Sequence, residues 1–346
     1  MKESLLQYLR CPDCRAPFEL KVQKGSADEI VSGRLQCRNC ESTYPIEKGI
    51  PRILPDLDRT AYTYCKNYEY QWLTLDWHRP ELTNRRFYEL TKWRPEDIKG
   101  KAIMDAGCGG GRWVYEFARE GAGDVIAFDY TLAVERAREI CSEFSNVHYV
   151  QTDIFKMPFS DDSMDIVHCH GVLHNLPEPL EGLRNLSAKV KPGGEIAFLV
   201  HRNLTPLQTI IDHSICWVTS RLPIPFMYYF SYLPTLIEYI PGALFLFENI
   251  FHLSAQPGFM RKHWHNFDWY TSKYKHRTSP QQAERWLRDL HFPDIKILDT
   301  NEFRIRSKYG KVREIKEKLL EKGFFLKATL GVRATKYSSS SQLDPA

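Results

Sequence analysis

The segment AIMDAGCGGGRWV, residues 102–114, combines a glycine run with one carboxylate that could serve a ligand. Four glycines stand within residues 107–111, and Asp105 precedes the first of them by two positions. Backbone N–H groups without a Cβ can approach a ligand closely at the start of a helix. A dinucleotide loop would need its third glycine where Arg112 stands. A carboxylate ahead of this D-x-G-x-G-x-G run suits a cationic amino group, such as that of S-adenosylmethionine.

Two further aspartates follow the next two predicted strands. Asp129 ends DVIAFD, 24 residues after Asp105, where a carboxylate can accept hydrogen bonds from both ribose hydroxyls. Asp153 ends VHYVQTD, where it can accept from an adenine amino group. Each aspartate alone could be a strand-end cap. Their occurrence at successive strand ends favours one ligand at the carboxyl edge of a sheet.

Histidines at the ends of the fourth and fifth strands are candidate bases. They are His170, His174 and His201, and His174 is the favoured one. An ordinary histidine pKa of about 6.5 suits proton transfer near neutral pH. If the ligand is S-adenosylmethionine, the expected reaction is methyl transfer. This reaction depends mainly on holding donor and acceptor in line and excluding water, and a base is needed only if the acceptor loses a proton. The alternative for each histidine is a hydrogen-bonded structural role.

Two CxxC pairs near the N-terminus predict a metal site. CPDC and CRNC supply Cys11, Cys14, Cys37 and Cys40, with 22 residues between the pairs. Four thiolates can surround one Zn²⁺ in a tetrahedron. A redox dithiol is the alternative, but it does not need two pairs. A site with four cysteine ligands leaves no open position for catalysis, so we expect a structural zinc.

The elements that must position these residues indicate an α/β fold. Strands expected at 101–107, 124–130, 147–153, 163–171 and 194–202 alternate with helices, and 294–300 and 325–336 complete seven strands. Repeated βαβ units predict a doubly wound, mostly parallel, Rossmann-like sheet. The expected organisation is a zinc-ribbon-like domain (1–54), linker helices (55–100), the core (101–202 and 279–336), a helical lid insertion (203–278) and a disordered tail (337–346).

Residues 102–201 resemble the class I S-adenosylmethionine-dependent methyltransferases, and VKPGGEIAFLV is similar to the branch that includes ubiquinone and menaquinone biosynthesis enzymes. Asn175 stands where that branch more often has a second adjacent histidine. The resemblance implies that Asp105 and the loop glycines hold the methionine part, Asp129 the ribose, and Asp153 the adenine. The cofactor-binding set that it implies is Asp105, Ala106, Gly107, Cys108, Gly109, Gly111, Asp129, Tyr130, Asp153, Ile154 and His170.

The N-terminal unit has a resemblance of its own. With the cysteine pairs, TYPIEKGIPRIL, residues 43–54, is similar to the small zinc-ribbon activator subunit that partners several RNA and protein methyltransferases. Here the unit is fused to the enzyme. We expect it to stabilise the core or to shape the substrate entrance.

The insertion at 203–278 is apolar and aromatic, but prolines, Glu238 and Glu248 interrupt it. It has no clean run of the ~20 apolar residues that a spanning helix needs. A hydrophobic lid or a surface that touches a bilayer is expected. The segment RKHWHNFDWYTSKYKHR, residues 261–277, could meet a phosphate, a sugar diphosphate or RNA. The alternative is a self-packed helical subdomain with a solvated basic edge.

Composition narrows the function. The chain is 43% hydrophobic and 26% charged, with a net charge of +4 that by itself does not argue for nucleic acid. The leading hypothesis is methylation of a small or lipid-like molecule, at oxygen. An RNA (tRNA or rRNA) methyltransferase is second, although HGVLHN stands where many base N-methyltransferases carry an NPPY-type segment. A non-catalytic cofactor-binding scaffold is third.

The expected location is the cytoplasm, with peripheral contact at the inner face of the membrane as a further expectation. The first residues have no apolar signal region, and the five cysteines outside the two pairs are scattered as free thiols would be.

Overall fold

The structure, a computed structural model, describes residues 1–26, 29–54, 59–74, 87–88, 90–202, 206–240, 258–298 and 329–338. The strands are β1 (Phe18–Gly25), β2 (Ile30–Cys37), β3 (Thr43–Glu47), β4 (Ile50–Ile53), β5 (Ile103–Ala106), β6 (Val125–Asp129), β7 (Val147–Thr152), β8 (Met164–His170), β9 (Val190–His201), β10 (Asp294–Leu298) and β11 (Thr329–Thr335). The α-helices are α1 (Arg59–Thr74), α3 (Pro95–Ile98), α4 (Arg112–Arg119), α5 (Ala133–Ile140), α6 (Pro179–Lys189), α7 (Pro206–Thr219), α8 (Ile224–Phe230), α9 (Tyr232–Ile237), α11 (Phe259–Thr271) and α12 (Pro280–Asp289). Short 3₁₀ helices are η1 (Glu3–Gln7), η2 (Ile154–Lys156) and η3 (Leu173–Asn175).

The core is the expected doubly wound sheet. Its seven strands follow the order β7-β6-β5-β8-β9-β11-β10. Neighbours from β7 to β9 pair in parallel, and β11 runs antiparallel to both β9 and β10. The order reverses between β5 and β8, so the loops after these strands diverge and leave room for a ligand at their carboxyl ends.

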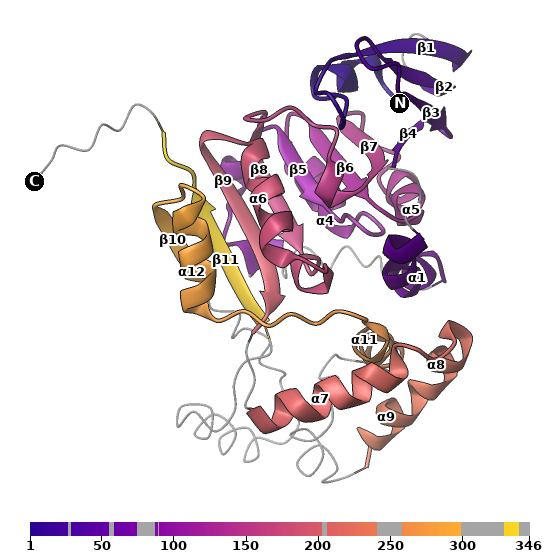
Figure 1. The fold of residues 1–346 in the computed structure, drawn as a ribbon, viewed down its shortest axis with the longest axis vertical. Helices are drawn as coiled ribbons and strands as arrows, with labels where there is room; N and C mark the ends of the chain where they lie inside the picture. The colour runs from indigo at the N-terminus through magenta and orange to yellow at the C-terminus, as the bar shows by residue number, and fades with distance from the viewer. Residues whose placement is uncertain are drawn as a thin grey trace, which may run out of the picture.

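Both faces of this sheet are covered, which explains why its strands read as continuous apolar runs. Successive residues of a strand point to opposite faces. Met104 and Phe128 join a core with α6, α12 and the N-terminal unit, whereas Ile103 and Val125 join a second core with α4 and α5. Figure 1 shows α6 and α12 on one side of the sheet.

The cysteine unit extends the sheet of the core. Strands β1 to β4 form an antiparallel meander, and β4 then pairs in parallel with β7 through Arg52↔Gln151 and Ile53↔Thr152. The result is one sheet of eleven strands (Figure 1). The zinc-ribbon interpretation of the unit is confirmed. The unit is continuous with the core sheet because β4 pairs with β7, a strand that is distant in the sequence.

The insertion after β9 forms a helical layer at the carboxyl end of the strands, as expected for a lid. Helix α11 contacts α7, α8 and α9, and together they bury a small cluster around Met227, Phe267 and Trp269. The chain returns to the core at α12, where the Ser279 side chain caps the helix by accepting a hydrogen bond from the Gln282 N–H at 3.1 Å. Among the residues that the structure describes, no helix is both long and apolar enough to cross a membrane.

Some predicted elements lie outside the described residues. These are the first residues of the strand at 325–336, residues 203–205 and 241–257 of the insertion, and the tail from 339. Of the linker helices expected at 55–100, the structure describes α1, residues 87–88 and 90–91, and α3.

Candidate functional site

A cavity of about 320 Å³ lies at the carboxyl ends of the parallel strands. The loops after β5, β6, β7 and β8 form one wall, and α1 and α11 form the opposite wall. This is the edge where open α/β sheets bind ligands. Most of the residues predicted to bind the cofactor or to accept a proton therefore line the same cavity.

The cavity gathers part of the predicted cofactor set and all three predicted histidines. The predicted cofactor residues that line it are Gly107, Asp129, Tyr130, Asp153, Ile154 and His170. His174 and His201 line it as well. The remaining predicted residues, which lie behind the lining in β5 and the glycine loop, are Asp105, Ala106, Cys108, Gly109 and Gly111.

Three glycines of the loop each allow a different neighbouring residue to approach the backbone closely. Gly107, Gly109 and Gly111 all have positive φ (69°, 51° and 83°), which L side chains rarely adopt. A Cβ at Gly107 would lie 2.4 Å from Val172, and one at Gly109 would lie 2.5 Å from the Trp72 indole of α1. A Cβ at Gly111 would lie 2.8 Å from the Ala137 backbone of α5. Gly107 thus keeps the cavity open, while the other two allow α1 and α5 to pack.

Asp105 lies beneath the glycine loop, 1% exposed. Its Oδ1 is 2.7 Å from Nδ1 of the equally buried His168, and its Oδ2 is buried without a hydrogen-bond partner. Arg112 is the nearby buried cation. Burial lowers its pKa to about 10, although Asp105 raises it. A buried acceptor left open directly behind Gly107 fits a cationic group of a ligand in the cavity.

Asp129 is the best-anchored carboxylate of the cavity wall. It accepts hydrogen bonds from the Gly109 N–H (2.8 Å) and from the N–H and hydroxyl of Thr131 (2.9 and 2.7 Å). Burial raises its pKa, and these hydrogen bonds work in the opposite direction. A carboxylate offers about four lone-pair sites, and Oδ1 already accepts two hydrogen bonds, so the remaining acceptor capacity lies on Oδ2. The position suits a hydroxyl of a ribose.

His174 and His201 form a histidine pair across the cavity floor. Their ring centroids are 3.8 Å apart, although they come from the loop after β8 and the end of β9. A two-histidine arrangement is therefore present despite Asn175, built from residues far apart in the sequence. Burial lowers the pKa of His174 to about 3, helped by Lys275, Arg277 and His276, so its ring is neutral at physiological pH.

A buried charge cluster stands behind this pair. Asp212 of α7 accepts a hydrogen bond from the Trp269 indole (2.6 Å), pairs with Arg277, and lies 3.5 Å from the Lys275 ammonium. Burial raises the pKa of Asp212, but Lys275 and Arg277 outweigh it and the net shift is downward. Two cations share the Asp212 carboxylate here, and Lys275 also interacts with the Asp268 carboxylate of the cavity lining.

Several lining residues were not singled out in the sequence analysis. They come from α1 and α11 and include Tyr68, Gln71, Trp72, Arg261, Trp264, His265 and Asp268. Asp268 matters most chemically, because burial raises the pKa of its carboxyl to about 6, with Lys275 opposing the rise. The sequence contains a signal that could have identified this residue, because Asp268 is the only acidic residue in the basic segment 261–277.

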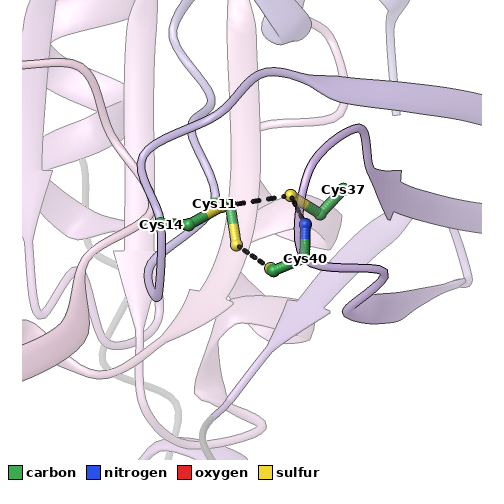
Figure 2. A group of neighbouring side chains, drawn as sticks. All are labelled: Cys11, Cys14, Cys37 and Cys40. Carbon is green, nitrogen blue, oxygen red and sulfur yellow. Dashed lines mark hydrogen bonds between the residues drawn. The ribbon is translucent and has the colours of Figure 1, made fainter.

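The four paired cysteines converge as predicted (Figure 2). Their sulfur atoms all lie within 4.8 Å of one another; Cys11 and Cys40 are 3.5 Å apart and Cys14 and Cys37 are 3.4 Å apart. A tetrahedron with Zn–S distances of about 2.3 Å places sulfurs about 3.8 Å apart. The N–H groups of Asn39 and Cys40 both point at the Cys37 sulfur (3.4 Å), as zinc knuckles require. The donor set fits a structural Zn²⁺.

Comparison with known proteins agrees with this architecture. Residues 97–220 match the family model described as a methyltransferase domain, and residues 2–49 match the model of Trm112p-like proteins.

The chain contains a methyltransferase domain, at residues 97–220. Its methyltransferase domain is preceded by a Trm112-like unit that carries the zinc-binding cysteines. S-Adenosylmethionine is the cofactor of such domains, and the open Asp105 oxygen, the Gly107 cradle and the Asp129 carboxylate fit it.

Three curated relatives illustrate the range of similar methyltransferases. An uncharacterized chloroplastic methyltransferase of Arabidopsis thaliana, At2g41040, is 24% identical over 54% of this chain and 60% of its own length. The tRNA U34 carboxymethyltransferase of Nautilia profundicola is 28% identical over 29% of this chain and 34% of its own. The ubiquinone biosynthesis O-methyltransferase of Aliivibrio fischeri is 34% identical over 30% and 46%. The matches thus span 34% to 60% of these relatives.

Proposed function

We propose that this methyltransferase transfers the methyl group of S-adenosylmethionine to an oxygen of a small or lipid-like acceptor. The observation that carries the proposal is the shared cavity. Strand-end carboxylates form its cofactor side, while His174, His201 and Asp268 form the side under the lid. Residues of α1 and α11 line the site and would help to exclude water from the transfer, which the reaction requires.

The chain's own residues bind and orient the cofactor. Asp129 would accept a hydrogen bond from a ribose hydroxyl and Asp153 one from the adenine amino group, while the open oxygen of Asp105 would attract the methionine ammonium. When bound, S-adenosylmethionine would supply a methyl group that is attached to a positively charged sulfur. The acceptor oxygen would displace that sulfur from the methyl carbon in line. Fixing these three contact points fixes the direction in which the methyl group faces.

The acceptor side can remove a proton. The acceptor O–H bond breaks as the new C–O bond forms, and the proton passes to Asp268, whose pKa of about 6 leaves it mostly ionised at neutral pH. His174, with its pKa of about 3, is a weak base, so we assign it hydrogen bonding to the acceptor through its unpartnered Nδ1. Lys275 and Arg277 favour negative charge on the acceptor oxygen.

The similarity to a ubiquinone biosynthesis O-methyltransferase supports an oxygen acceptor on a lipid-like molecule. The apolar composition of the lid supports it independently, because an amphiphilic acceptor needs apolar surface near the site. Exposed apolar side chains gather on α7, α8 and α9.

The direct test is methylation of a whole-cell extract. Purified full-length protein is incubated with extract and tritium-labelled S-adenosylmethionine, and the products are separated into lipid, small-molecule, RNA and protein pools. We expect label in the lipid or small-molecule pool, and much less of it with Asp129→Ala at the same cofactor concentration. Calorimetry with S-adenosylmethionine runs beside it: binding without any labelled product would instead support a non-catalytic scaffold.

RNA is the second candidate acceptor. The Trm112-like unit and the similarity to a tRNA U34 carboxymethyltransferase favour it. Label in the RNA pool, together with salt-sensitive binding of bulk tRNA, would establish this function and contradict the first.

A further inference from the structure

The lid carries an exposed apolar face that packs against nothing in the described structure. Eighteen large hydrophobic side chains of the described residues are exposed, and eleven of them fall between Ile210 and Ile240. The most exposed include Tyr229 (71%), Trp217 (63%) and Leu236 (55%). Such a concentration is unusual for a solvated surface and marks a contact site. We call it the outer lid face.

The outer lid face results from an amphipathic pattern. On α7, Ile210, Trp217 and Val218 point outward, while Asp212 and Cys216 point toward α11. On α8 and α9, Phe226, Tyr229, Phe230, Leu233 and Leu236 are exposed at spacings of three or four, while Met227 and Thr235 are buried. The helices therefore have a packed inner side and an equally apolar outer side.

Charge is almost absent from this face. Among the described side chains of residues 209–240, Arg221 is the only exposed lysine, arginine, aspartate or glutamate. Asp212 and Glu238 point inward, where Glu238 pairs with Lys262. The Arg221 guanidinium lies 4.4 Å from the centre of the Trp217 ring. Trp, Tyr and a snorkelling Arg beside aliphatic side chains are the composition of a helix surface at a membrane interface.

We propose that the outer lid face docks onto the surface of an anionic phospholipid bilayer. Helices α7, α8 and α9 have 14, 7 and 6 residues, too short to span, so they would lie in the interface plane. In the described lid, residues 206–240 and 258–278, Arg221 and Lys273 are exposed and no aspartate or glutamate is exposed, a balance that attracts anionic lipid. Figure 1 shows these helices at the end of the molecule opposite β1.

The docking face and the cavity share one helix. Residues of α11 such as Arg261, Trp264 and Asp268 line the cavity, and the same helix contacts α7, α8 and α9. A bilayer under the lid would therefore lie one helix layer from the acceptor side. A role of the bilayer in delivering the acceptor rests on the proposed function. The docking of the outer lid face onto the bilayer does not depend on that function.

The test is co-sedimentation of the full chain with vesicles of phosphatidylcholine alone and of phosphatidylcholine with about one third phosphatidylglycerol. We expect binding to the anionic vesicles, weakened by salt. The variant W217S/Y229S/L233S should bind about 10-fold less or worse, because three large apolar contacts are lost. The matched control V22S/V31S alters exposed apolar residues of the cysteine unit (53% and 38%) and should bind as the wild type does.

Thermal unfolding and cofactor calorimetry separate docking from folding and from transfer. The triple variant should keep the wild-type unfolding temperature and its affinity for S-adenosylmethionine, even if the extract assay finds no acceptor. Three results would overturn the proposal. They are wild type that stays in the supernatant, dimers that the triple variant abolishes, and a triple variant with a lowered unfolding temperature, which would mean that the chain itself covers this face.

Discussion

Arg52, on β4 at the end of the cysteine unit, donates a hydrogen bond to the side-chain oxygen of Gln151 on β7 at 2.9 Å. The Gln151 amide in turn donates to the Tyr130 carbonyl, also at 2.9 Å, in the wall of the cofactor cavity. Arg52 is 9% exposed and also pairs with Glu135 at 2.6 Å. The zinc unit thus reaches the cofactor loop through two side chains, in addition to extending the sheet.

Removing Arg52 should weaken both stability and cofactor binding. Arg52→Ala leaves Gln151 and Glu135 without their buried donor, so we expect a loss of about 2–4 kcal/mol in the free energy of unfolding. S-Adenosylmethionine should bind more weakly in calorimetry because Tyr130 loses its support. Lys48→Ala breaks an exposed pair with the same Glu135 and should cost at most about 1 kcal/mol. Equal effects of the two variants would contradict the relay.

Zinc removal should destabilise the whole sheet, since β4 completes it beside β7. We expect metal analysis to find one zinc per chain, and Cys37→Ser to lose it and lower the unfolding temperature. Cys169→Ala alters a buried cysteine of the core and should keep the zinc. A metal-free Cys37→Ser protein with unchanged stability would show that the core does not depend on the unit.

Asp129→Ala should weaken S-adenosylmethionine binding by roughly 10-fold to 100-fold, because hydrogen bonds to a charged acceptor contribute about 1.5–3 kcal/mol. Calorimetry measures the affinity, and thermal unfolding checks that the loss of the Gly109 and Thr131 contacts has not unfolded the loop. Asp162→Ala, an exposed aspartate of the turn before β8, is the control. Unchanged affinity in Asp129→Ala would remove this residue from the cofactor site.

The pH dependence of methyl transfer should follow Asp268 rather than His174. Asp268 accepts a proton only when ionised, so kcat/KM should rise as pH increases through about 6 and fall below it. Asp268→Asn should abolish this rise and lower kcat by about 10²–10⁴-fold. His174→Gln should keep the inflection, because His174 is already neutral above its pKa of about 3. An inflection that disappears with His174→Gln would make that histidine the base.

The sequence by itself determined the local elements. Local sequence patterns predicted the glycine run, the strand-end aspartates 129 and 153 and the four cysteines. Each of these features is defined by residues close together in the chain, either a strand followed by a turn or a CxxC knuckle. Seven apolar segments that alternate with helices were enough to predict the doubly wound sheet, and the structure supplied its strand order.

Only the tertiary structure decided which distant residues share the cavity. Asp268 lies on one face of an inserted helix, and His174 meets His201 across two strand ends at 3.8 Å. Trp72 approaches Gly109 from a helix some thirty residues earlier, and β4 adds to β7 rather than ending its own sheet. These contacts depend on how separate elements pack against one another. Periodicity along the chain records the side that a helix buries but not the partner that it meets.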